Sequence, residues 1–229
     1  MEFEYLDLIE TVDRLHELCE KLSIKGVVNG DASQIKIISE IKERIDTMEI
    51  QDDAAINVVL QAIEMVKPNI FVCLGDLGEW NSISPWKYKR RKRPPLEYSI
   101  ENLEIESAKV NAGLDLFDNV LKKVGCTNKH MIEGNHDNWL NSFVDEFPYL
   151  PQYKFKNIMN LDDRGYKYYP YGHLMHIGKL YFYHGGHYTT VNHTRQHVMN
   201  LGKNVLYGHT HDVQRQGVTH VDGAHHAWT

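Results

Sequence analysis

Apolar residues recur at helical spacing in several parts of the chain. Within residues 3–22 they alternate with charged residues, which predicts an amphipathic helix packed on the domain or on a partner chain. A second helix is expected to begin at Asp52 or Asp53, where either carboxylate can cap it, and to end at Pro68. A third, longer helix is expected over about residues 97–124.

Short apolar runs predict the strands of a sheet. The run at residues 70–74 is apolar throughout, which is typical of a strand buried on both faces in a parallel sheet. Together with the strand at residues 35–39 and the helix between them, it predicts a βαβ unit. One helix, near residues 194–201, interrupts a second half that is otherwise rich in strands. The expected strands are Ile35–Ser39, Ile70–Leu74, Lys129–Glu133, Tyr166–Tyr169, Lys179–Tyr183, Asn204–Tyr207 and Val218–Val221.

This order of elements predicts a single α/β domain. No internal repeat or low-complexity linker interrupts it. We expect residues 1–33 to form an N-terminal amphipathic helix and a turn, and residues 34–229 to form the domain. An irregular insertion is expected at residues 80–95.

The composition is that of an ordinary globular protein, with 42% hydrophobic and 24% charged residues among 229. No apolar run approaches the roughly 20 residues that cross a bilayer, so no membrane partner is expected. Residues 1–5 carry acid where a secretory signal carries lysine or arginine, so we expect a cytoplasmic protein. The widely spaced Cys19, Cys73 and Cys126 are interpreted as buried thiols rather than disulfides or metal ligands.

Candidate chemistry lies directly after the predicted strands. Fourteen histidines are present, concentrated between His173 and His226, which favours a metal site. Loops at strand ends converge on one edge of an α/β sheet, and Asp, Asn and His are oxygen and nitrogen ligands for Mn, Fe, Zn, Ni or Mg. Each segment is a weak signal alone, but their joint occurrence is strong. They are Gly75-Asp76, Gly134-Asn135-His136-Asp137, His184-Gly185 and Gly208-His209-Thr210-His211.

This series resembles the calcineurin-like metallophosphoesterases, whose pattern is D-x-H, G-D-x-x-(D/E), G-N-H-(D/E), a glycine–histidine segment and G-H-x-H. The resemblance covers about residues 35–222. It implies a four-layer αββα sandwich of two mixed sheets flanked by helices. It also implies hydrolysis of phosphomonoesters or phosphodiesters, including nucleotides or nucleic acid, by metal-activated water. The aromatic spacing looks closest to enzymes encoded by bacteriophages, which implies the host cytoplasm.

The resemblance also implies the ligands of one or two divalent ions per chain. Asp76 would bridge two metals. Asn135, His184 and His209 would complete one site, and His211 would belong to the other.

Two further residues receive catalytic roles from the resemblance. His136, as an imidazolium, would donate a proton to the leaving alkoxide, and Asp137 would keep it charged and oriented. No Cys or Ser lies in a nucleophile motif, so no covalent intermediate is implied.

The first motif departs from the family pattern. Glu40-Ile41-Lys42 stands where the family has Asp-x-His. Glu40 keeps a carboxylate and stays a candidate ligand, but an ammonium has no lone pair for a cation. Three outcomes follow for the first metal site. It is filled weakly through Glu40, Asp76, His211 and water, or it is empty and the Lys42 ammonium pairs with Asp76. In the third outcome Lys42 is neutral, because desolvation and nearby cations lower its pKa. We favour the second outcome. The alternatives are that Glu40 and Lys42 are solvated residues outside the site, or that the chain is a catalytically impaired metal-binding or nucleic-acid-binding homologue.

The insertion carries six cations with two interleaved aromatic residues over residues 86–93. One interpretation is a nucleic-acid contact through Lys87–Arg93, and the other is a solvated loop. His193 and His197 share a helix face and are expected at the surface or lining a pocket, because no third zinc ligand is obvious. His225 and His226 are expected to be mobile. Because the family adds further strands beyond this point, we also expect a truncated C-terminus with an unpaired sheet edge.

Overall fold

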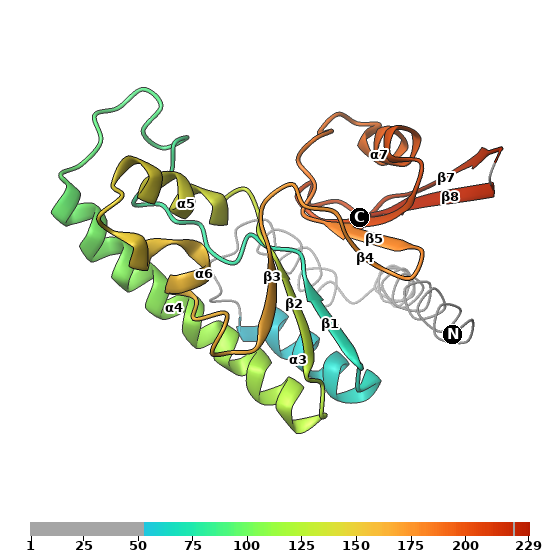
Figure 1. The fold of residues 1–229 in the computed structure, drawn as a ribbon, viewed down its shortest axis with the longest axis horizontal. Coiled ribbons are helices and arrows are strands. Elements are labelled where there is room, and N and C mark those ends of the chain that lie inside the picture. The colour runs from blue at the N-terminus through green and yellow to red at the C-terminus, as the bar shows by residue number, and fades with distance from the viewer. Residues whose placement is uncertain (1–52, 222) are drawn as a thin grey trace, which may run out of the picture.

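A computed structural model describes residues 53–221 and 223–229 of the chain (Figure 1). The expected helix at residues 3–22, the strand at residues 35–39 and the division after residue 33 lie outside these residues. The helices are α3 (Asp53–Val66), α4 (Leu96–Lys123), α5 (Asp137–Glu146), α6 (Phe155–Ile158) and α7 (His193–Leu201), with a 3-10 turn at Pro151–Tyr153. The strands are β1 (Ile70–Cys73), β2 (Asn128–Ile132), β3 (Tyr166–Tyr169), β4 (Met175–Ile177), β5 (Leu180–Tyr183), β6 (Asn204–Tyr207), β7 (Arg215–His220) and β8 (Gly223–Trp228).

The described strands form two sheets. In the first sheet, β1, β2 and β3 are parallel neighbours in that order, because helices return the chain to the same end of the sheet between strands. The second sheet has the order β4-β5-β6-β8-β7 and is mixed, with parallel pairs at β5–β6 and β6–β8. We expected both sheets to be mixed, but the described part of the first sheet is parallel throughout.

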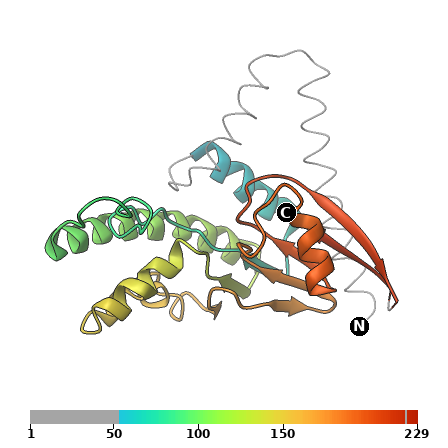
Figure 2. The ribbon, with the colours of Figure 1, turned by 90° about the horizontal axis from the view of Figure 1, so that it is seen from above.

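Alternating side chains divide the molecule into four layers. Phe71 and Cys73 of β1 face the core under α4 and α5, whereas Val72 faces the second sheet. That inner core includes Phe182 of β5 and Trp228 of β8. On the outer face of the second sheet, Tyr183, Val198 and Val205 form a separate core beneath α7. Figure 2 shows α7, in orange, lying against the strands of that sheet. The four-layer αββα sandwich is therefore confirmed.

The two long helices were predicted closely, and they pack against each other. Ile63 of α3 joins Leu121 and Cys126 in a small core. Cys126 is buried and Cys73 is partly buried, and both are free thiols, as the sequence predicts for structural cysteines. No helix among the described residues is long and apolar enough to span a membrane.

The strand that carries His225 and His226 was not predicted from the sequence. Residues 223–228 form β8, which pairs with β6 on one side and β7 on the other. His225 and His226 therefore belong to a paired strand, and the expectation that they are mobile was wrong. Their two-sided pairing could not be read from the sequence, because both partner strands are chosen by tertiary packing.

Candidate metal centre

Four of the predicted ligands lie at the carboxyl ends of four strands. Asp76 follows β1 and Asn135 follows β2, while His184 comes directly after β5 and His209 follows β6. Because β1–β2 and β5–β6 are parallel pairs, each pair of loops leaves its sheet at a common edge. The two sheets therefore contribute two side chains each to one place.

The donor atoms of these side chains converge. Asn135 Oδ1 lies 2.9 Å from His184 Nε2 and 2.8 Å from His209 Nδ1. His184 Nε2 also lies 3.1 Å from Asp76 Oδ2 and 3.3 Å from His209 Nδ1. Among the described residues, one group of three side chains of the types His, Cys, Asp and Glu could hold a metal ion. It consists of Asp76, His184 and His209, whose ligand atoms all lie within 4.8 Å of one another.

The chemistry of this cluster fits a cation. His184 Nδ1 lies 2.7 Å from the carbonyl oxygen of Leu74, so an N–H there donates to that carbonyl and leaves a lone pair on Nε2. This lone pair faces two oxygens that only accept hydrogen bonds, Asn135 Oδ1 and Asp76 Oδ2. Acceptors packed this closely need a shared cation or proton between them. Two imidazoles, a carboxylate and an amide oxygen suit Mn, Fe, Zn, Ni or Mg.

The electrostatics of the cluster point the same way. Burial alone would raise the pKa of Asp76, but the hydrogen bond and charge of His184 hold that pKa below its usual value. Burial would lower the pKa of His184, and the Asp76 carboxylate raises it instead. The pKa of His209 is lowered by burial and by the neighbouring His184. His209 is thus held neutral, and without an ion a proton on His184 Nε2 would occupy the place between that nitrogen and Asp76.

Asp137 joins the two loops of the first sheet. Its side chain is fully buried and accepts hydrogen bonds from the backbone N–H of Asp76 at 2.7 Å, of Leu77 at 3.1 Å and of Gly134 at 3.1 Å. The Trp80 indole N–H donates to the same carboxylate at 3.1 Å. Burial and the nearby Asp76 charge raise the pKa of Asp137 to about 7, against the effect of these donors. The carboxylate fixes the backbone that carries Asp76.

Two glycines allow these loops to touch. A Cβ built on Gly75 would lie 2.2 Å from the Gly134 nitrogen, and one built on Gly134 would lie 2.1 Å from Asp76 Oδ1. Gly75 also has a φ of +92°, which L side chains rarely adopt. The glycines in both motifs are therefore required by the close approach of Asp76 to the second loop.

His136 lies beside the cluster with a partner that the sequence reasoning missed. Its backbone N–H donates to Asp76 Oδ1 at 2.9 Å, and its ring stacks on Trp139 with centroids 4.2 Å apart. Its Nδ1 lies 3.9 Å from Glu79 Oε2. The signal was present, because Gly75-Asp76-Leu77-Gly78-Glu79 completes the pattern G-D-x-x-(D/E). Asp137, predicted to orient His136, instead directs its oxygens to four N–H donors.

Among the described residues, His211 is the candidate ligand that is not part of this cluster. His211 is exposed and, among the described residues, does not belong to the group of converging ligand atoms. Both His209 and His211 have positive φ values, 71° and 53°, so this His-x-His lies in a turn rather than on a strand. Glu40 and Lys42 lie outside the described residues.

His193 and His197 lie behind the cluster rather than at the surface. They are 3% and 0% exposed, so the expected surface position was wrong. His193 bonds to the Tyr207 hydroxyl at 2.5 Å and to Asp212 at 3.0 Å, while His197 bonds to the Tyr183 hydroxyl. Tyr183 and Tyr207 are the last residues of β5 and β6. The helix α7 therefore holds the ends of the two strands that carry the candidate imidazole ligands.

This fold and this cluster define an αββα sandwich with a candidate metal site at the carboxyl ends of its strands. A family model described as calcineurin-like phosphoesterase matches residues 34–217. The chain belongs to the calcineurin-like phosphoesterase family. No curated protein and no solved structure matched the chain in the corresponding searches.

Proposed function

We propose that this chain hydrolyses phosphomonoesters or phosphodiesters, with Asp76, Asn135, His184 and His209 holding one divalent ion. The convergence of these four donor atoms carries the proposal. A bound cation would supply positive charge for the phosphoryl oxygens and would activate the attacking water. Mn²⁺ is our choice of ion for the first experiments. A bacteriophage origin and a cytoplasmic location are further proposals from the family likeness.

The residues of the chain provide the remaining steps. His136 donates a proton to the leaving oxygen, and the Glu79 carboxylate lies 3.9 Å from His136 Nδ1. The stack on Trp139 fixes the plane of the imidazole ring. Asp137 positions the Asp76 backbone through its hydrogen bonds and does not itself exchange protons with substrate.

The test compares hydrolysis of bis(p-nitrophenyl) phosphate and diphenyl phosphate with Mn²⁺ and with chelator, alongside ions bound per chain. His136→Ala should keep its metal and lose about 100-fold to 10,000-fold in kcat. The loss should be larger for diphenyl phosphate, because phenolate needs the proton more than p-nitrophenolate does. His176→Ala, which changes an exposed histidine of β4, is the matched control. Absence of bound metal in the unaltered chain would refute the proposal.

A catalytically impaired homologue is the second candidate, and Lys42 is the observation that favours it. An ammonium cannot ligate a second ion, and a one-metal site loses part of the stabilisation of an in-line displacement. If this reading is right, Glu40→Asp with Lys42→His should raise both turnover and the number of Mn²⁺ ions bound per chain. Unchanged metal content and rate in the double variant would remove this segment from the site.

A further inference from the structure

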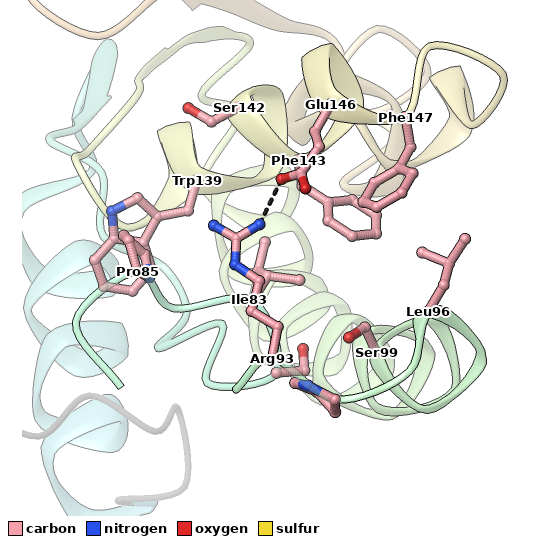
Figure 3. Close-up of a pocket in the computed structure, with 12 residues that line it drawn as sticks. Ile83, Pro85, Arg93, Leu96, Ser99, Trp139, Ser142, Phe143, Glu146 and Phe147 are labelled. Carbon is pink, nitrogen blue, oxygen red and sulfur yellow. Dashed lines mark hydrogen bonds and ion pairs between the residues drawn. The ribbon is translucent and has the colours of Figure 1, made fainter. Parts of the chain in front are cut away.

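A cavity of about 310 Å³ lies beside Trp139 and outside the metal cluster (Figure 3). Its walls come from the insertion after β1, the first turn of α4 and the exposed side of α5. The insertion follows the loop of Asp76, and α5 begins at Asp137. Both walls are therefore continuous with the loops of the candidate site.

Trp139 connects the cavity to the proposed proton donor. Its side chain lines the cavity, and its indole stacks on His136 at 4.2 Å with an interplanar angle of 20°. A group held in the cavity therefore lies one aromatic ring away from the residue that protonates the leaving oxygen. This location suits a part of the substrate joined to the reacting phosphate.

The lining suits a flat ring with a polar edge. Trp139, Phe143 and Phe147 supply aromatic walls, and Pro85 and Pro94 add rigid apolar ones.

At the rim of the cavity, Arg93 pairs with Glu146, as the dashed line in Figure 3 shows. Both members of this ion pair are about half exposed, at 55% and 51%, so exchanging the pair for a ligand costs little. The volume is near the lower end of the roughly 300–1,000 Å³ of ligand pockets, which suits one ring system.

The insertion also presents cations and an exposed aromatic ring. Trp86 is 67% exposed, and Lys89 lies over its ring at 5.2 Å. The six cations of residues 87–93 end at Arg93, which belongs to the cavity rim. A cationic approach that leads to an aromatic pocket is typical of sites for nucleotides and single strands, where phosphates meet the charges and a base stacks.

We propose that this cavity binds the nucleobase of a nucleotide phosphoester whose phosphate lies at the metal centre. Hydrolysis of the attached phosphate rests on the proposed function, whereas binding of the nucleobase in the cavity does not. The base itself comes either from a small nucleotide or from the end of a single strand. Either source supplies the same ring and the same polar edge.

Binding is measured first, because it does not depend on turnover. Saturation-transfer NMR on the full chain, with chelator, should detect thymidine and not 2-deoxyribose. Leu96→Trp, which fills the cavity from α4, should abolish the thymidine signal, and Leu116→Trp should preserve it. Leu116 is exposed on the same helix and outside the cavity, so it controls for the same change. Ser142→Trp fills the cavity from α5 and serves if Leu96→Trp does not fold.

Hydrolysis with Mn²⁺ then tests the link to the reaction. The dinucleotide d(TpT) should be cleaved with kcat/KM about tenfold above its abasic analogue, as expected for one stacked base. Leu96→Trp should reduce that ratio to near one. An oligothymidylate preferred over d(TpT) would assign the base to a single strand, and the reverse would assign it to a small nucleotide.

The two hypotheses fail differently. Thymidine binding without hydrolysis of any phosphoester would retain the base site and refute the proposed function. Hydrolysis of bis(p-nitrophenyl) phosphate without thymidine binding would refute the base site alone. A thymidine signal that survives both cavity-filling variants would also overturn the base site.

Discussion

Two side chains of the proposed metal centre, His184 and Asp76, depend on partners outside the cluster. The Leu74 carbonyl selects the free nitrogen of His184, and the His136 N–H occupies one oxygen of Asp76. Asp137 in turn holds the backbone of Asp76. Outer partners of this kind orient metal ligands, and their loss typically costs about 10-fold to 100-fold in metal affinity.

Gly134→Ala tests this dependence at a single carbon atom. The new Cβ would lie 2.1 Å from Asp76 Oδ1, so the carboxylate must move away from the other ligands. We expect about 10-fold to 100-fold weaker Mn²⁺ binding, measured by calorimetry. Gly208→Ala is the control, because its Cβ would lie 3.6 Å from the His184 carbonyl, an ordinary contact distance. Equal losses in both variants would contradict the explanation.

At the scale of elements, α7 supports the strands that carry the imidazole ligands. Its buried His197 contacts the Tyr183 hydroxyl and packs on the Tyr207 ring with centroids 3.9 Å apart. Burial lowers the pKa of His197 from its ordinary value of about 6.5 to about 4. The neutral imidazole is therefore part of the folded state.

This burial predicts a pH dependence of stability. The unfolded chain binds the proton more readily than the folded chain, so protonation favours unfolding. The contribution of His197 should be complete above about pH 6.5 and decline as the pH falls towards 4, by on the order of 3 kcal/mol in total. Urea unfolding of the unaltered chain and His197→Gln across this range measures it. The variant should show a shallower decline, and parallel curves would contradict the prediction.

Most elements could be predicted because their patterns are local. The termini of β3 and β6 agree with the sequence prediction, and those of α4 differ from it by one residue. The helix α5 was missed because its first residues read as a ligand loop, although apolar residues at 139, 140, 143 and 144 have helical spacing. The role of Glu79 was missed for another reason. Glu79 completes the G-D-x-x-(D/E) pattern, but the pattern does not name its partner, because the closeness to His136 arises only after β1 and β2 pair.

At the scale of the whole molecule, one ion would join the two sheets. Two of its proposed ligands follow strands of the parallel sheet, and two follow strands of the mixed sheet. Binding to the folded state alone stabilises that state by mass action. The ion is therefore expected to act on the packing of the sandwich as well as on chemistry.

Metal removal should lower the stability of the entire sandwich. Free Mn²⁺ at a thousand times its Kd should raise the unfolding free energy by about 4 kcal/mol over the chelated protein. Denaturant unfolding followed by circular dichroism measures the difference. His209→Ala, which removes one proposed ligand, should respond far less to the same Mn²⁺ concentration. An equal response in that variant would place the ion elsewhere.

The division of the ligands between sheets also sets an order of events during synthesis on the ribosome. Asp76 and Asn135 emerge with the first sheet, but His209 follows β6, the third strand of the second sheet in chain order. A nascent chain that ends at β3 has the carboxylate and the amide without either imidazole. With the proposed ligands, metal capture would therefore report that both sheets have been made and joined, and an intermediate with the first sheet alone would remain without an ion.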